Sequence, residues 1–82
     1  MTAQEIESRV LSAIPGAQIK AVDLKGGDHF EIEVVSDRFQ GCSMVQQHRM
    51  IYDALGDAMR AEIHALVIRT LTPEQRREEQ PV

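Results

Sequence analysis

The sequence is poor in aromatic residues and has no tryptophan. Aromatics make up 4% of its 82 residues, and they are Phe30, Phe39 and Tyr52. A chain of this length buries only about 60–65% of its unfolded surface when it folds, so its core is thin. That core must be built from aliphatic side chains, with the four methionines filling irregular gaps. The length predicts one domain over residues 1–82.

Cysteine is scarce and long apolar runs are missing. Cys42 is the only cysteine, so no disulfide can form within the chain, and nothing indicates an oxidising compartment. The first 15 residues are polar and acidic and lack the apolar region of a signal peptide. No apolar run approaches the roughly 20 residues that cross a bilayer. We therefore expect a cytoplasmic protein with no membrane-bound part.

Positive charge is also in short supply. Nine lysine and arginine residues stand against thirteen aspartate and glutamate residues, which gives a net charge of −4. Non-specific binding to nucleic acid depends on a basic surface that releases counterions from the phosphates. The composition argues against strong binding of that kind. A small basic patch of Lys20, Arg38 and Arg49 stays open as an alternative to ordinary solvated charges.

Motifs that carry catalysis are missing. The sequence has no plausible order for a Ser/His/Asp triad, no CxxC or HExxH spacing for zinc, and no phosphate-binding loop. A domain of this size also has little room for a deep cleft. We therefore expect a binding module and not an enzyme.

The sequence does contain a regular succession of helix and strand signals. Capping residues ahead of apolar positions spaced three or four apart indicate helices, and alternation of apolar and polar residues indicates strands. The clearest strand begins at His29 and places Phe30, Ile32 and Val34 on one face. The expected elements are, in order, a helix over 2–14, a strand over 18–24, a turn over 25–28, a strand over 29–36, a loop over 37–42, a helix from Ser43 to about Met59, a strand over 62–70 and a last helix from Thr72 that frays before Pro81.

This order, αββαβα, predicts an α+β fold with a three-stranded mixed sheet and the helices packed on one face. The first two strands should form an antiparallel hairpin. The third strand follows a helical crossover, so it should run parallel to the second with a right-handed connection. Parallel neighbours begin at the same edge of a sheet and lie about 5 Å apart. His29 and His64, each at the start of its strand, should therefore lie at the same end of the sheet.

The third strand leaves the orientation of His64 open. Its density of apolar residues predicts a central strand or one buried on both faces. Strict alternation puts His64 on the face of Leu66 and Ile68, and the residues do not reveal whether that face meets the helices. A residue at the frayed first position of a strand can escape this alternation. From the residues alone, His64 is either a partly buried, hydrogen-bonded residue or a metal ligand. His29 is either an exposed loop residue or a metal ligand.

Three segments of the sequence resemble the BolA family. The stretch from Phe39 to Tyr52 (FQGCSMVQQHRMIY) resembles the family's F-x-G-x-S motif, followed by R-H-R and an aliphatic-Tyr/Asn pair. Residues 63–66 (IHAL) resemble its I-H-A-L segment, and residues 70–74 (TLTPE) resemble its T-x-T-P-E segment. The GGDHF turn matches the variable hairpin loop of the family, which carries His or Cys. The resemblance covers about residues 3–79.

The resemblance implies a fold similar to the class II KH domain and a role in binding. Members of the family bind monothiol glutaredoxins, and a shared [2Fe–2S] cluster is held by glutaredoxin cysteine, glutathione cysteine, and His or Cys of the BolA-like chain. The matching positions here are His64 and His29. Imidazole nitrogen can replace thiolate in such clusters. Because two histidines leave the iron incompletely ligated, the isolated chain should hold no cluster. We also expect the isolated chain to be a monomer. The expected role is iron–sulfur assembly or trafficking in the response to iron or redox stress.

A second interpretation is a DNA-binding transcriptional regulator, because other members of the family are linked to transcription control. The KH-like helix–loop surface would then use Phe39, Gly41, Ser43, His48 and Arg49. Two features weaken this interpretation. Gln47 takes the place of the first arginine of R-H-R, and the sequence has no GxxG loop to clamp a nucleic-acid backbone.

Cys42 and His48 carry further alternatives. Cys42 stands where the family often has a basic or aliphatic residue, just before a helix N-terminus, where a thiolate is favoured. It is an ordinary loop cysteine, a reactive thiol or a third metal ligand. His48 falls on the apolar side of the long helix, and we interpret it as a structural residue that is hydrogen-bonded at the margin of the core.

Overall fold

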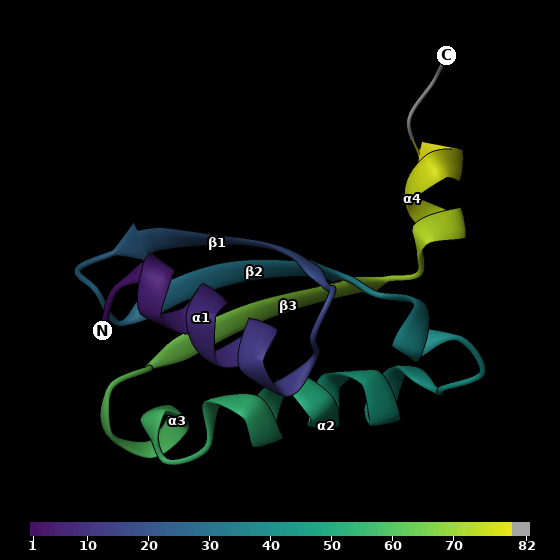
Figure 1. Cartoon of the computed structure of the whole chain (residues 1–82). Coiled ribbons are helices and arrows are strands. Elements are labelled where there is room, and N and C mark those ends of the chain that lie inside the picture. Colours follow the sequence, from purple (N-terminus) through teal and green to yellow (C-terminus); the bar gives the residue numbers. More distant parts are fainter. Residues whose placement is uncertain (80–82) are drawn as a thin grey trace.

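The computed structural model describes residues 1–79, and its elements follow the predicted order (Figure 1). They are α1 (Ala3–Ala13), β1 (Gln18–Lys25), β2 (His29–Val35), the 3-10 helix η1 (Asp37–Phe39), α2 (Met44–Leu55), α3 (Ala58–Ala61), β3 (Ala65–Leu71) and α4 (Pro73–Glu79). The α+β class and the αββαβα order are confirmed, with two short helical segments, η1 and α3, added. The fraying predicted before Pro81 lies outside the described residues. No helix within residues 1–79 is long and apolar enough to cross a membrane.

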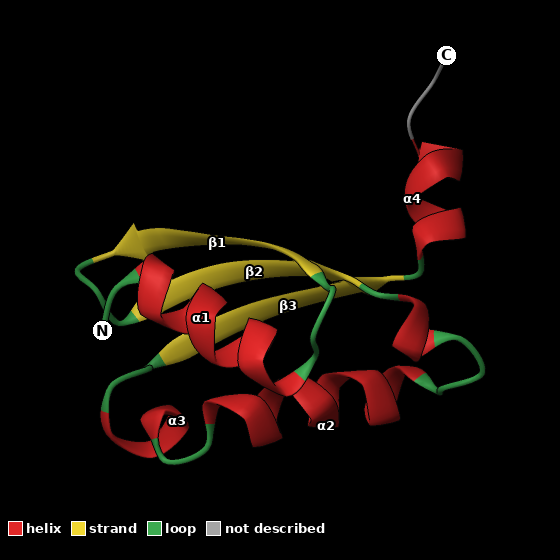
Figure 2. Ribbon diagram, viewed as in Figure 1, coloured by secondary structure: helices red, strands yellow, loops and turns green. Residues whose placement is uncertain are grey.

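The three strands form one mixed sheet in the order β1-β2-β3 (Figure 2). β1 and β2 pair antiparallel, with Ile19 opposite Val34. β2 and β3 pair parallel and in register, starting with His29 opposite Ala65. The predicted hairpin and the predicted parallel crossover are both confirmed.

The core lies between the sheet and the helices α1 and α2 (Figure 2). On β2 the side chains of Phe30, Ile32 and Val34 are fully buried, as the alternation of that strand predicts. They belong to one cluster with buried residues of α1, η1 and α2, which include Ile6, Val10, Phe39, Ile51 and Leu55. Aliphatic side chains and two phenylalanines therefore make up most of the core, as the shortage of aromatics requires.

The helix starts agree with the predicted caps. The Thr2 hydroxyl accepts a hydrogen bond from the backbone N–H of Glu5 at 3.1 Å. The Thr72 hydroxyl accepts one from the N–H of Gln75 at 3.2 Å. In both cases a side-chain oxygen satisfies a backbone donor that the helix itself leaves unpaired.

β3 is an edge strand, so the prediction of a central or doubly buried strand is wrong. β2 occupies the centre of the sheet. Leu66 and Ile68 pack against the core, whereas Val67 between them is 57% exposed. No second helical layer within residues 1–79 covers the other face, so that face stays open along most of the strand. β3 also begins at Ala65 and not at residue 62, which leaves His64 just outside it.

The helix predicted from Ser43 to about Met59 ends earlier than expected. Ser43 caps α2 as predicted, and it forms a reciprocal capping box with Gln46. α2 ends at Leu55 because Gly56 adopts a φ of 54°, which side chains disfavour and which takes the backbone out of the helix. The chain turns there before the short α3.

The buried face of α2 differs from the apolar stripe that helical spacing predicts, which contains Met44, His48, Ile51, Tyr52, Leu55 and Met59. Gln47 is buried beside Ile51 and Leu55, whereas Met44 and Tyr52 are 57% and 43% exposed. A buried amide is tolerated at this position because both of its ends are hydrogen-bonded. The outer side of α2 is consequently more apolar than the pattern predicts.

The prediction that the helices pack on one face holds for α1 and α2, but α4 lies elsewhere. It projects from the end of β3, away from the layer that α1 and α2 form (Figure 1). Its Arg76 pairs with Glu33, which alternates with the buried Ile32 and so points to the open face of the sheet. Arg69 joins Glu33 to Glu79 on the same face. These ion pairs hold α4 against the sheet at the end where β3 finishes.

Candidate functional site

Two histidines meet at one end of the sheet. His29 is the first residue of β2, and His64 directly precedes β3. Their ring centroids lie 5.1 Å apart, and the ring planes are inclined by 50°. The prediction that parallel pairing brings these two side chains to a common end is confirmed.

His64 is exposed because it lies just outside the strand. Within β3, alternation would turn its side chain to the face of Leu66, toward the helices. Instead the backbone N–H of His64 donates to the carbonyl oxygen of Asp28 at 2.7 Å, and the N–H of Ala65 donates to the same oxygen at 3.2 Å. The chain therefore enters β3 with the imidazole beside His29 and open to solvent.

Asp28 belongs to the site although the sequence did not single it out. It ends the hairpin turn, and its Oδ1 lies 2.6 Å from Nδ1 of His29. This hydrogen bond is the main reason why the pKa of Asp28 lies below its usual value. The electrostatic effects of His29 and His64 act in the same direction, and desolvation acts against them. The signal that could have revealed it is the Asp-His pair at the end of the Gly-Gly turn.

The histidine pair offers two nitrogen donors at an exposed rim. Imidazole nitrogen is a common ligand of zinc and of iron. Within residues 1–79, no group of three or more His, Cys, Asp or Glu side chains is arranged to hold a metal ion. A shallow hollow of about 320 Å³, lined by Asp28, Arg60 and Glu62 among others, leaves room beside His64. A metal centre at this rim would need further ligands from outside the described part of the chain.

The sequence over residues 7–75 matches the family described as BolA-like protein. This chain belongs to the BolA-like family. That family is non-enzymatic, so the prediction that the chain is not an enzyme is confirmed. The family match takes in both histidines and the hairpin turn between β1 and β2.

Individual relatives agree with the family and the fold. The BolA-like chain is 37% identical over 78 residues to Protein BOLA2 of Arabidopsis thaliana, which covers 92% of this chain and 83% of the relative. It is 34% identical over 71 residues to the DNA-binding transcriptional regulator BolA of Vibrio cholerae. That match covers 87% of this chain and 67% of the relative. The solved structure of a bolA protein homologue from Coxiella burnetii superposes with a TM-score of 0.80 at 31% identity, covering 94% of this chain and 97% of that one.

In this BolA-like protein Cys42 lies at the opposite end of the sheet from the histidine pair. β2 runs from His29 to Val35, and Cys42 follows η1 beyond that strand (Figure 1). Seven strand residues span about 20 Å. The Cys42 thiol lies within hydrogen-bond distance, 3.5 Å, of the carbonyl oxygen of Arg38. The interpretation of Cys42 as a third ligand beside the histidines is therefore wrong, and a loop cysteine or a reactive thiol remain as interpretations.

The structure does not bring the five residues predicted for DNA contact together on one exposed surface. Phe39 is 1% exposed and belongs to the core, and the Ser43 hydroxyl is occupied as a helix cap. Gly41 lies in the exposed loop, with a φ of 76°. Arg49 is exposed and His48 half-buried on the outer side of α2. There they line a shallow hollow of about 510 Å³ together with Val45, Tyr52 and Asp53.

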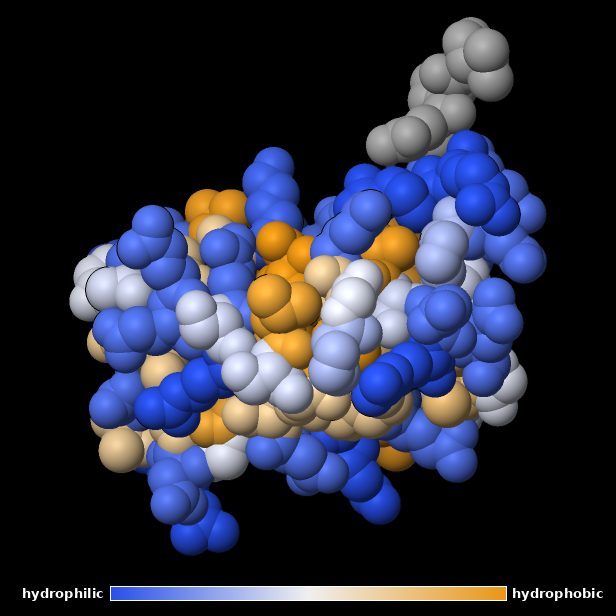
Figure 3. Space-filling view, viewed as in Figure 1, coloured by the Kyte–Doolittle hydropathy of each residue, from blue (hydrophilic) through white to orange (hydrophobic). Residues whose placement is uncertain are grey.

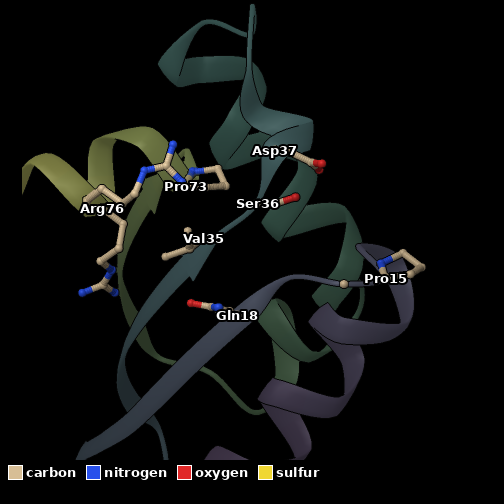
Figure 4. A pocket seen from close by; sticks show the side chains of 9 residues that line it. Pro15, Gln18, Val35, Ser36, Asp37, Pro73 and Arg76 are labelled. Carbon is tan, nitrogen blue, oxygen red and sulfur yellow. The ribbon is translucent and has the colours of Figure 1, made fainter.

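A pocket of about 530 Å³ lies at the end of the sheet far from the histidines (Figure 4). Residues of the α1–β1 connection, β2, η1 and α4 line it. Asp37 and Arg76 bring opposite charges to its wall, and Arg76 is already paired with Glu33. The labelled side chains are spread around the opening and do not converge on one point. We assign no chemistry to this pocket.

Apolar side chains also gather at the centre of the face that carries α1, with hydrophilic side chains around them (Figure 3). Leu11 of α1 is 46% exposed and lines a shallow hollow with Ala17 and Ile19. The hollow contains no histidine or cysteine. The hollow therefore offers no imidazole or thiol ligand, unlike the hairpin end of the sheet, where His29 and His64 lie close together.

Proposed function

We propose that this BolA-like protein binds a monothiol glutaredoxin, and that His29 and His64 are its ligands to a [2Fe–2S] cluster held between the two chains. The observation that carries the proposal is the distance of 5.1 Å between the two ring centroids at an exposed end of the sheet. The glutaredoxin cysteine and the cysteine of glutathione would supply the thiolates. The chain would then serve cluster assembly or trafficking in the cytoplasm during iron or redox stress.

The donor set of the pair fits such a cluster. Histidines replace two of the four thiolates in one known class of [2Fe–2S] centre, where they raise the reduction potential. The His29 side chain is 37% exposed, and His64 is exposed as well, so a second chain can reach both rings. Because no group of three or more possible ligands in residues 1–79 is arranged to hold a metal ion, the pair suits a cluster that two chains share.

The open face of the sheet next to the histidines also suits a partner chain. Val22, Glu31 and Val67 lie side by side across the three strands. Val22 and Val67 are 41% and 57% exposed, and Leu24 nearby on β1 is 53% exposed. Apolar patches that a small domain leaves open often mark interaction sites. The far half of this face carries the ion pairs of α4, so the apolar part is confined to the end with the histidines.

The test is to titrate the chain into glutaredoxin loaded with its cluster, without oxygen, and to record visible circular dichroism and absorption. We expect a spectrum that differs from that of glutaredoxin alone. His64→Ala and His29→Ala should each change the spectrum of the mixed complex, because each removes one nitrogen ligand. His48→Ala is the matched control, since His48 lies on α2, and it should leave the spectrum unchanged. A His64→Ala complex with the wild-type spectrum would remove the ligand assignment.

A second function, DNA binding, is favoured by one observation, the name DNA-binding transcriptional regulator that the relative from Vibrio cholerae carries. We propose the outer side of α2 around Arg49 as the surface for it. Binding of a labelled duplex, followed by fluorescence anisotropy, should weaken steeply with salt and should weaken further in Arg49→Ala. Binding that is absent at low salt, or that does not change with salt, would count against this function.

A further inference from the structure

Asp28 touches both histidines, through different groups. Its carboxylate lies 2.6 Å from Nδ1 of His29. Its carbonyl oxygen accepts the backbone N–H groups of His64 and Ala65. We propose that Asp28 is the positioning residue of the site, and that its carboxylate holds His29 in the tautomer in which Nε2 is the atom that binds iron. This inference rests on the proposed function, in which His29 is a cluster ligand.

The hydrogen-bond chemistry of the two side chains determines the tautomer. An ionised carboxylate can only accept hydrogen bonds, so Nδ1 of His29 must carry the proton in the contact with Asp28. An imidazole with its one proton on Nδ1 has its lone pair on Nε2. An aspartate side chain is ordinarily ionised at neutral pH. A carboxylate behind a metal-binding histidine fixes the orientation of the ring and makes it a stronger ligand.

The turn that carries Asp28 is itself well held. Gly26 and Gly27 both have positive φ angles, 67° and 77°, which glycine adopts without steric cost. The Asp23 carboxylate accepts the backbone N–H groups of Lys25 and Gly27 at 3.0 and 3.1 Å. The position of Asp28 is therefore set by the backbone of the turn, and replacing its side chain should leave the chain path in place.

This arrangement separates the effects on the two histidines. Substitution of the Asp28 side chain removes the bond to Nδ1 of His29, but it keeps the carbonyl oxygen that accepts from His64. The effect should therefore appear at His29. Loss of charge alone can be tested with Glu78→Gln, because Glu78 is exposed on α4, away from the histidines, and its side chain takes part in none of the hydrogen bonds and ion pairs of residues 1–79.

The first measurement uses the chain without any cluster. Long-range proton–nitrogen NMR spectra at a pH well above the usual imidazole pKa distinguish the two tautomers of each histidine. We expect His29 to carry its proton on Nδ1 in the wild type and in Glu78→Gln, and to move toward the Nε2 tautomer in Asp28→Ala. A wild-type His29 protonated on Nε2 would overturn the inference. The dispersion of the amide signals in the same samples shows whether Asp28→Ala is folded, and Asp28→Asn provides a second variant of nearly unchanged shape.

The second measurement uses the complex with cluster-loaded glutaredoxin. Loss of a carboxylate behind a ligating histidine typically costs about 10- to 100-fold in metal affinity. We expect Asp28→Ala to weaken cluster retention in the complex by about this factor, with Glu78→Gln near the wild type. If His29→Ala alters the cluster spectrum and Asp28→Ala retains the cluster as well as the wild type, the positioning role is wrong and the proposed function stands. If His29→Ala itself has no effect, the proposed function fails first.

Discussion

The hydroxyl of Thr70 on β3 donates a hydrogen bond of 2.6 Å to Oε1 of Gln47 on α2, and both side chains are buried. The Nε2 of Gln47 donates to the carbonyl oxygen of Cys42 at 3.0 Å. A single amide therefore ties the loop before α2, the helix and the third strand together. Gln47 stands at the position where the BolA-like R-H-R motif has its first arginine. In this chain that position therefore holds a buried structural residue.

Thr70→Val should destabilise the protein although valine has nearly the same shape as threonine. The substitution leaves Oε1 of Gln47 buried without its donor, which costs about 1–3 kcal/mol in the free energy of unfolding. Urea denaturation followed by far-ultraviolet circular dichroism measures this difference. Ser12→Ala, on the exposed side of α1, is the control and should stay within about 0.5 kcal/mol. Equal stability of Thr70→Val and the wild type would show that the hydrogen bond makes no net contribution.

Ile32→Ala should lower the free energy of unfolding by about 2–5 kcal/mol, because Ile32 is fully buried on the central strand and the truncation leaves a cavity. Val22→Ala on the neighbouring strand removes exposed surface and should change stability by less than about 0.5 kcal/mol. The same urea titration measures both variants. Similar losses in the two variants would mean that the open face of the sheet is covered in solution.

Val67→Glu should weaken the binding of monothiol glutaredoxin by about tenfold or more, which corresponds to about 1.4 kcal/mol. A carboxylate there would be buried by the partner and would lie beside Glu31, and both effects oppose binding. Isothermal titration calorimetry measures the affinity. Val45→Glu is the matched control, because Val45 is 69% exposed on α2, away from the histidines. An affinity that falls only in Val45→Glu would place the partner on α2.

Cys42→Ser should leave the visible spectrum of the complex with glutaredoxin unchanged. Cys42 follows η1, beyond the end of β2 that is opposite to His29, so its thiol cannot share a cluster with the histidine pair. Anaerobic absorption and circular dichroism spectra of the variant complex provide the measurement. A shift of the charge-transfer bands would mean that a cluster forms at a different site from the one proposed.

Much of the fold follows from signals within a few residues of one another. The caps at Thr2, Ser43 and Thr72 each depend on a partner three residues further on, so the sequence suffices to predict them. The buried face of β2 follows from its own alternation. The meeting of His29 and His64 required one more step, the parallel direction that a helical crossover imposes on the strands it joins.

Tertiary structure decided the features that depend on what lies opposite a residue. Gln47 is buried because Thr70 and the loop before α2 satisfy its amide, and no pattern within α2 contains that information. Val67 is exposed because no layer in the described part of the chain covers its face of β3. His64 lies outside β3, where its backbone N–H bonds to Asp28 in the hairpin turn. The sequence by itself determined the main helices and strands, their order and the two candidate histidines. The burial of Gln47, the exposure of Val67 and the departure of His64 from β3 depend on contacts between segments far apart in the chain, which local spacing does not encode.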